Sequence, residues 1–244
     1  MQLWICPLLA FLSGSIPFGL FISKAKGVDI RKHGSGNIGA TNVYRVIGRK
    51  HGLLCLLLDA LKGFVPVVIA LNLIPDGGGA PMLKLGLLDG LRMATPPDPF
   101  VAQLLHVVTA LAAVLGHNYS PWIGFKGGKG IATSAGVLIA LMPGAVLILL
   151  VVFTLALVTT RYVAVASMVA AVCLPMVTHL GARYHEHEKG VSLWEAGVWN
   201  KPLFFFSLAI AILAVWKHRS NIRRLRDGTE SKFGAKPQPV SKAS

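Results

Sequence analysis

The chain has 244 residues, of which 54% are hydrophobic and only 14% are charged. A soluble domain is normally about a quarter charged, so this composition excludes an ordinary soluble protein and predicts an integral membrane protein. The net charge of +14 is spread over several loops, and no basic soluble module stands out that would bind nucleic acid. We therefore expect contact with membrane lipid and no nucleic-acid partner.

Apolar segments of membrane length recur along the chain. Helices suit all of them, because lipid offers no partner to unpaired backbone groups. The expected spans are 3–22, 52–74, 100–115, 131–158, 162–180 and 202–216. The first span is expected to be retained rather than cleaved, because Lys24 and Lys26 follow its apolar run, and this order places the N-terminus outside.

The 28 residues from Ile131 to Val158 contain no charged residue and allow two topologies. One tilted span gives six spans and separates the two basic regions, 23–51 and 217–244, each of net charge +6. A break at Met142–Gly144 gives seven spans and puts both basic regions on the cytoplasmic side. We expect an all-α, polytopic membrane protein of seven transmembrane helices, with its N-terminus outside and its C-terminus cytoplasmic.

The segments outside the spans are expected to be connectors and a tail. The near-neutral stretches 75–99 and 181–201 fall outside in the seven-span topology, and the glycine-rich part at 76–79 indicates a flexible connector. A single membrane-embedded domain should cover 1–233, followed by a disordered tail at 234–244. The three cysteines are far apart in apolar sequence, so we expect free, buried thiols at Cys6, Cys55 and Cys173.

The first of three polar clusters is GSGNIGATN at residues 34–42, directly after the first span. It matches G-x-G-x-x-G, but no strand precedes it, so we reject a dinucleotide site. Curled backbone N–H groups and polar side chains would form a phosphate-binding set. The side chains of this set are Ser35, Asn37, Thr41, Asn42 and Arg45. Thr41 and Arg45 share a face if a helix begins near Gly39, and the alternative is a flexible linker between two spans.

The second cluster contains GFKGGKG at residues 124–130. It resembles a Walker A loop only superficially, because Ile123 replaces the first glycine and Gly130 replaces the Ser or Thr that would bind Mg²⁺. We therefore expect no nucleoside-triphosphate site. Lys129 still lies among glycines just before a helix, where the helix dipole and the ammonium group both favour an anion. The alternative is a basic anchor that only sets topology.

The third cluster, KHRSNIRRLR at residues 217–226, leaves the last span, and we expect it to continue as a helix that ends at Asp227–Gly228. His218 and Asn221 are three residues apart and face the same way. The arginines could simply lie on anionic lipid, but that does not explain the His218 and Asn221 pair.

Three further polar residues lie within the expected spans. Ser167 could touch a substrate or only bond to its own helix. Asp59 and Lys62 are three apart, and they could be functional or could neutralise each other as a structural brace. The cytoplasmic loops contain almost no carboxylates, and no H-E-x-x-H or G-x-S-x-G motif occurs. We therefore expect neither a metal site nor another cofactor.

Taken together, GSGNIGATNVYR (34–45), GHNYSPWIGFKGGKG (116–130) and KHRSNIRRL (217–225) resemble the three cytoplasmic motifs of the bacterial acyl-phosphate:glycerol-3-phosphate acyltransferases, the PlsY family. SGSIPFG at 13–19 is similar to that family as well. The resemblance implies a seven-helix enzyme of the bacterial inner membrane with its site on the cytoplasmic side. It would move a fatty acyl group from acyl-phosphate to the 1-hydroxyl of sn-glycerol 3-phosphate, giving lysophosphatidic acid and phosphate in phospholipid biosynthesis.

The resemblance also implies roles for the residues of the clusters. Acyl-phosphate would meet Ser35, Gly36, Asn37, Thr41 and Lys129, with Gly128 as a further substrate-binding candidate. Glycerol 3-phosphate would meet Arg45, Ser167, His218 and Asn221. The hydroxyl proton would pass either to His218 or to a phosphate group of the substrate itself.

The resemblance also implies partners, and two alternative functions stand beside it. The donor would come from an acyl-phosphate-producing enzyme, and the sequence leaves the oligomeric state open, with a monomer compatible with it. One alternative function is a membrane transporter of an organic phosphate, which should show related halves, but the clusters are unpaired. Another is a non-catalytic scaffold whose basic face binds anionic lipid.

Overall fold

The computed structural model describes residues 4–76, 82–95, 97–188 and 201–234, and this part of the chain contains helices and no strand. The α-helices are α1 (Ile5–Ser15), α2 (Phe18–Lys24), α3 (Ala40–Val46), α4 (Arg49–Leu73), α5 (Pro99–Asn118), α6 (Ile131–Leu141), α7 (Pro143–Thr160), α8 (Val163–Glu188), α9 (Lys201–Lys217) and α10 (Arg219–Arg226). Short 3₁₀ turns are η1 (Ile30–Lys32), η2 (Gly86–Leu91) and η3 (Pro121–Ile123). The glycine-rich connector at 77–79 and the tail from 235 onward lie outside the described residues.

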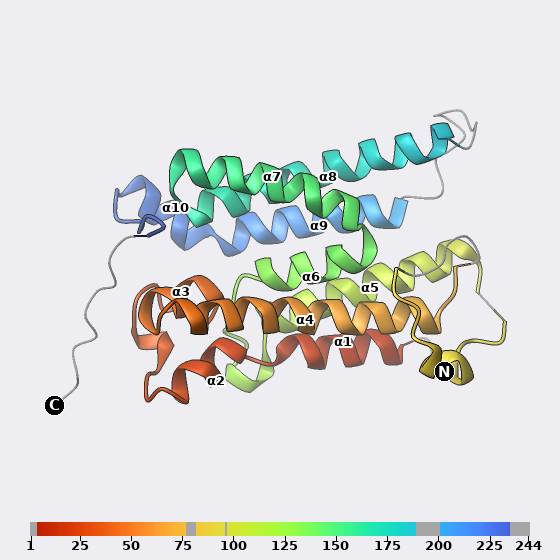
Figure 1. Ribbon diagram of the computed structural model, residues 1–244, viewed down its shortest axis with the longest axis horizontal. Coiled ribbons are helices and arrows are strands. Elements are labelled where there is room, and N and C mark those ends of the chain that lie inside the picture. Colours follow the sequence, from red (N-terminus) through yellow and green to blue (C-terminus); the bar gives the residue numbers. More distant parts are fainter. Residues whose placement is uncertain (1–3, 77–81, 96, 189–200, 235–244) are drawn as a thin grey trace.

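The long helices form two layers that run along a common axis (Figure 1). Helices α1, α4 and α5 pack together in one layer, and α7, α8 and α9 form the other. Between them, the short helix α6 contacts α4, α5 and α7, while α5 also contacts α9. The main apolar core lies at this junction and includes Val67, Val114, Val137, Leu174 and Ile210. The two layers therefore share a core.

Five helical segments in the described residues are long and apolar enough to cross a bilayer. They are Ile5–Lys24, Arg49–Leu73, Pro99–Ile123, Pro143–Thr160 and Val163–Gly181. A sixth results when α9 and α10 are counted together despite the 49° bend between them. These segments match the expected spans closely, because a long apolar run leaves a helix as the only way to pair its backbone in lipid.

The expected break in the long uncharged stretch is confirmed at Met142, between α6 and α7. Helix α6 has 11 residues, about 16 Å at the α-helical rise, so it is shorter than a hydrocarbon core of about 30 Å. Helix α7, by contrast, has 18 residues, which are enough to cross. A count of seven spans, with α6 as a partial one, stays a prediction.

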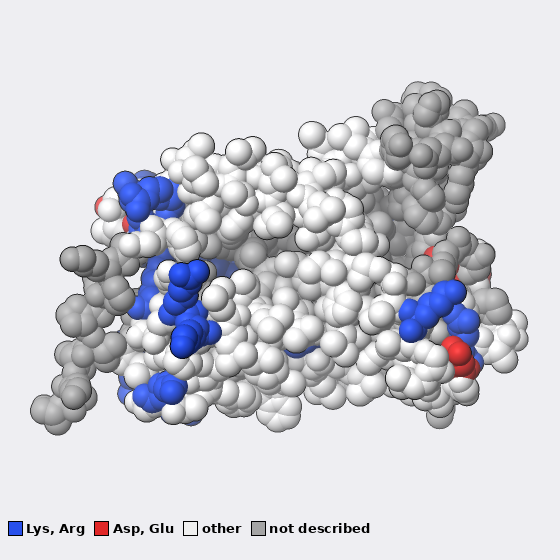
Figure 2. Space-filling model, viewed as in Figure 1, with Lys and Arg blue, Asp and Glu red and all other residues white. Residues whose placement is uncertain are grey.

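Charged side chains lie mainly at the two ends of the long axis of the bundle (Figure 2). Lys and Arg side chains gather at the end that carries α2, α3 and α10, a smaller mixed group lies at the other end, and the middle of the visible face is almost free of charge. Helix α7 buries only Leu149, and its outward side chains are apolar except for Thr154 and Thr159, whose hydroxyls donate to carbonyls of their own helix. An apolar belt between charged ends is what a bilayer requires of the protein that spans it.

Helices α1 and α5 approach each other closely, since small residues lie in their contact. A Cβ on Gly14 would lie 2.0 Å from the carbonyl oxygen of Ala113. Just beyond, the Ser120 hydroxyl donates to the Ser15 carbonyl at 2.6 Å, and Trp122 Nε1 donates to the Ser15 hydroxyl at 2.7 Å. Small-residue contacts of this kind let helix backbones approach in a membrane. They fix the C-terminal end of α5, where the second polar cluster begins, beside the first span.

Gly14→Ala should destabilise the protein by roughly 1–3 kcal/mol, because the added methyl group pushes α1 away from α5. The measurement is the thermal unfolding midpoint of the purified protein in detergent. Gly144→Ala is the matched control, since a Cβ at that position meets nothing within 4 Å, and its midpoint should not fall. An unchanged midpoint in Gly14→Ala would contradict the close approach of the two helices.

Candidate functional site

The first polar cluster is a loop at residues 34–39 that leads into α3. Asn42 holds this loop in shape: its Oδ1 accepts from the Ser35 N–H at 2.9 Å, and its Nδ2 donates to the Asn37 carbonyl at 2.9 Å. Gly36 has φ +70°, in the left-handed region that glycine adopts without strain. Asn42 is fully engaged inside the protein, so it supports the loop instead of serving as a donor to an anion.

Helix α3 starts at Ala40 with Gly39 as its N-cap, as the sequence predicts. Thr41 and Arg45 lie one turn apart on this helix, and both line the same cavity. The Arg45 guanidinium also donates through Nη2 to the Ser231 carbonyl at 2.9 Å. Arg45 is therefore held from one side by the chain that follows α10.

The second cluster is a glycine loop seated on the last turn of α5. The N–H of Gly128 donates to the His117 carbonyl at 3.1 Å, and a Cβ on Gly128 would lie 2.0 Å from His117 Nε2. The next residue, Lys129, donates through Nζ to Asn221 Oδ1. Burial lowers the pKa of Lys129 to about 8, so the ammonium group still carries its charge at neutral pH.

The third cluster follows the bend between α9 and α10, where His218 is 2% exposed. His218 Nδ1 lies 2.7 Å from the Ala214 carbonyl oxygen. A carbonyl only accepts, so Nδ1 bears the hydrogen, and Nε2 of the neutral ring has a free lone pair. Helix α10 ends at Arg226, and Gly228 has φ +69°, as the predicted C-terminal glycine requires.

Glu230 is a site residue that the sequence analysis missed. It is 8% exposed, its Oε1 accepts from Asn221 Nδ2 at 2.9 Å, and its Oε2 accepts from Arg224 Nε at 2.7 Å. Asn221 thus lies between the Lys129 ammonium and this carboxylate. The only signal in the sequence was that Glu230 is one of two acids within a basic tail. In the described part of the chain, no group of three or more His, Cys, Asp or Glu side chains could hold a metal ion.

The chain after α10 closes over this end of the molecule. The Phe233 N–H donates to the Arg161 carbonyl at 2.6 Å, which joins the tail to the turn between α7 and α8. The Phe233 ring stacks on Tyr44 of α3, with 5.7 Å between ring centroids. Residues 229–234 therefore contact both layers of the bundle beside Arg45.

The three clusters meet in one cavity of about 330 Å³. Eight of the ten predicted site residues line it: Ser35, Asn37, Thr41, Arg45, Lys129, Ser167, His218 and Asn221. Gly36 and Gly128 are not among the lining residues, and their roles in substrate binding stay a prediction. Gly36 makes the turn of the first loop and Gly128 packs on His117, so both glycines shape the walls from behind.

The far wall of the cavity is apolar. Leu53 and Leu56 line it from α4, and Phe153 and Leu157 line it from α7. The two α4 leucines are also about half exposed on the outside of the bundle, at 52% and 47%. The cavity therefore extends from a cationic, amide-rich end to helix surfaces that lipid would cover.

The sequence and the structure also match known proteins. The model of the family described as "Glycerol-3-phosphate acyltransferase" matches residues 4–228. A glycerol-3-phosphate acyltransferase of Geobacter sulfurreducens is 43% identical over 93% of this chain and 95% of its own, and one of Geotalea daltonii is 44% identical over 92% and 94%.

Two crystal structures of PlsY, an integral membrane glycerol 3-phosphate acyltransferase, share the fold. The glycerol 3-phosphate form has a TM-score of 0.73 at 35% identity, and the lysophosphatidic acid form has 0.70 at 34%. Each match covers 96% of this chain and 96% of the other chain. The chain described here belongs to the glycerol-3-phosphate acyltransferase family.

Proposed function

We propose that this integral membrane protein transfers a fatty acyl group from an acyl-phosphate to the 1-hydroxyl of sn-glycerol 3-phosphate, giving lysophosphatidic acid and inorganic phosphate. The observation on which the proposal depends is the meeting of three sequence-distant clusters in one cavity that is cationic at one end and apolar at the other. Both substrates bear phosphate and one bears an alkyl chain, so this cavity matches the pair. The two forms of the related PlsY structures support the same substrate and product.

The cationic groups of the cavity divide between the two phosphates. Lys129, with the hydroxyls of Ser35 and Thr41 and the side-chain amide of Asn37, suits the acyl-phosphate, because ammonium, O–H and N–H groups stabilise a phosphate oxygen. Gly36 contributes through the shape of this loop. Arg45 and Asn221, with His218 and Ser167 beside them, suit glycerol 3-phosphate, since a guanidinium can hold a phosphate with two parallel hydrogen bonds.

The reaction needs little covalent chemistry from the protein. The 1-hydroxyl oxygen attacks the acyl carbon, a new C–O bond forms, and the bond from that carbon to the phosphate oxygen breaks, so that phosphate leaves with the electron pair. Because the mixed anhydride is already activated, the protein has to align the substrates and stabilise the growing charge. Lys129 is placed for the second task, as a buried cation next to the departing phosphate.

The hydroxyl proton has two possible acceptors in this cavity. His218 Nε2 has a free lone pair in the neutral ring, and a phosphate oxygen of the acyl-phosphate is a base that the substrate brings with it. The Nδ1 contact of His218 is to a carbonyl and not to a carboxylate, so no acid stabilises a charged ring through that nitrogen. We infer that phosphate takes the proton, and that His218 orients glycerol 3-phosphate through Nε2.

We also propose how the protein lies in the membrane. Seven segments would cross or enter the bilayer: α1 with α2, α4, α5, α6, α7, α8 and α9, with α6 as the short one. The basic end of the bundle supports a cytoplasmic site in the inner membrane, with the N-terminus outside and the C-terminus inside. The acyl chain would lie between α4 and α7. A separate enzyme would supply acyl-phosphate, and the cavity is complete within one chain.

The first test is product formation by purified protein in detergent. Radiolabelled glycerol 3-phosphate with acyl-phosphate should give labelled lysophosphatidic acid and one equivalent of phosphate, and acyl-CoA should give none. Product from acyl-CoA alone would refute acyl-phosphate as the donor, and the absence of any product would favour a transporter.

Lys129→Ala should lower the rate of the same reaction by about 10²- to 10³-fold, as expected for the loss of one well-placed charge-stabilising group.

Arg45→Lys should lower kcat/KM for glycerol 3-phosphate by roughly tenfold or more, because an ammonium group cannot reproduce the planar fork that holds phosphate and the Ser231 carbonyl together. Steady-state kinetics with varied glycerol 3-phosphate measure this. Arg223→Lys is the matched control, since Arg223 is exposed on α10 outside the cavity, and it should behave as the unchanged protein. A basic surface that only binds lipid would tolerate both exchanges.

His218→Gln should raise KM for glycerol 3-phosphate while kcat stays within about tenfold, because an amide still bonds to the substrate but cannot take a proton. The measurement is turnover at saturating concentrations of both substrates. A fall in kcat of about 10²- to 10⁴-fold would instead assign the general base to His218.

A further inference from the structure

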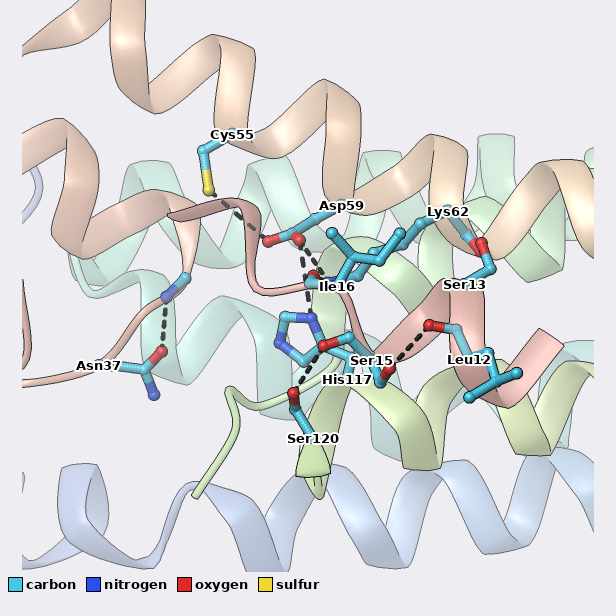
Figure 3. A network of polar contacts seen from close by, with 11 residues as sticks. Leu12, Ser13, Ser15, Ile16, Asn37, Cys55, Asp59, Lys62, His117 and Ser120 are labelled. Carbon is cyan, nitrogen blue, oxygen red and sulfur yellow. Dashed lines mark hydrogen bonds and ion pairs between the residues drawn. The ribbon is translucent and has the colours of Figure 1, made fainter. Parts of the chain in front are cut away.

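A buried charged network forms part of the cavity wall, and two of its members, Asp59 and His117, line the cavity. Figure 3 shows it from close by. Asp59 of α4 is 2% exposed, and its Oδ1 lies 2.7 Å from Lys62 Nζ and 3.7 Å from His117 Nδ1. Its Oδ2 accepts from Cys55 Sγ at 3.6 Å. One carboxylate therefore faces groups from two helices, α4 and α5, which confirms that Asp59 and Lys62 pair and places His117 next to the pair, at a distance longer than a hydrogen bond.

Lys62 connects this network to the first span. Its Nζ donates to the Ile16 carbonyl at 2.7 Å, at the break between α1 and α2 where Pro17 interrupts the helix (Figure 3). The Ser13 hydroxyl donates to the backbone carbonyl of Lys62 at 3.1 Å. Each polar group at the helix break thus has a partner, and the ammonium group of Lys62 is fixed between Ile16 and Asp59.

His117 connects the network to the loop of Lys129. Its Nδ1 side faces Asp59, and its Nε2 side faces Gly128, where a Cβ would lie only 2.0 Å away. The backbone bond from the Gly128 N–H to the His117 carbonyl fixes the same contact at 3.1 Å. The ring lines the cavity, and because Gly128 packs against its Nε2, the ring also supports the loop that carries Lys129.

We propose that Asp59, Lys62 and His117 are positioning residues for the Lys129 loop. Lys62 fixes the Asp59 carboxylate, Asp59 holds the His117 ring, and the ring sets how far Gly128, and with it Lys129, reaches into the cavity. A misplacement of about 1 Å at a catalytic group can cost on the order of 10²-fold in rate. The inference rests on the proposed function, in which Lys129 binds the acyl-phosphate.

The alternative is a purely structural role, in which the buried Asp59–Lys62 ion pair only holds the helices together. Breaking one partner of such a pair is destabilising, whereas replacing both by neutral residues is often tolerated. The two explanations therefore differ in what a neutral double variant does. A pair that only braces the fold leaves substrate affinity normal when both charges are removed, while a positioning pair leaves His117 without its anchor.

His117→Ala should raise KM for acyl-phosphate by roughly tenfold or more, as a displaced Lys129 loop requires, with KM for glycerol 3-phosphate little changed. His106→Ala is the matched control: His106 is on the same helix, is likewise 4% exposed, and bonds through Nε2 to the Ile74 carbonyl at 2.7 Å outside the cavity. It should lose stability but keep both KM values. Equal changes of KM in the two variants, or none in His117→Ala, would overturn the proposal.

Two double variants complete the test. Gly128→Ala should be impaired by the clash with the ring, and Gly128→Ala/His117→Ala should regain roughly tenfold of that loss, since coupled neighbours are not additive. Asp59→Asn/Lys62→Met should fold and keep a raised KM for acyl-phosphate. No recovery in the first double variant, or a normal KM in the second, would refute the positioning role.

The affinity of each variant for inorganic phosphate, measured by calorimetry, separates the positioning role from the proposed acyltransferase function. Weaker phosphate binding in His117→Ala than in His106→Ala supports the positioning role whether or not acyl transfer is seen, and equal binding contradicts it. If the protein without substitutions makes no product, by contrast, only the proposed function is refuted.

Discussion

The hydrogen bond from Lys129 to Asn221 joins the two layers of helices at the end where the cavity lies. Lys129 precedes α6, between the layers, and Asn221 belongs to α10, which continues from the other layer. Two more polar contacts cross the same boundary: Lys217 Nζ donates to the Asn118 carbonyl at 2.8 Å, and Arg45 reaches the Ser231 carbonyl. Of these cationic side chains, Lys129 and Arg45 both hold the layers together and line the cavity between them, so stability and anion binding depend in part on the same groups.

Glycine has two different tasks in this site. In the first loop it provides backbone conformations that other residues avoid, as at Gly36. In the second loop its lack of a side chain lets backbone rest on another residue, as Gly128 does on the His117 ring. Neither glycine lines the cavity, although a glycine-rich motif suggests direct contact with phosphate. The polar residues that do line the cavity depend on these supports for their positions.

The long helices and the break at Met142–Gly144 could be predicted because their causes are local, whereas the break at Pro17 inside the first expected span was not predicted. A long apolar run favours a helix in lipid, and a proline with a following glycine marks a break, as at Met142–Gly144. The meeting of Arg45, Lys129 and His218 could be expected as well, since all three follow spans on the side that basic loops prefer. The contacts of Glu230 and the packing of Gly128 on His117 could not be predicted. They join residues whose spacing in the sequence matches no helix or motif pattern. The bend at His218 was likewise hidden, since the residues around it favour a continuous helix.

The closing of the chain over Arg45 has a practical consequence for anyone who handles this protein. The family model ends its match at residue 228, yet Ser231 and Phe233 still contact the wall of the cavity through Arg45, Tyr44 and Arg161. A shortened expression clone that stops at the end of α10 would remove Ser231 and free the guanidinium of Arg45 from its carbonyl partner. A tag joined through a spacer after Gly234, or a tag at the N-terminus, keeps Ser231 and its contact with Arg45 in the protein.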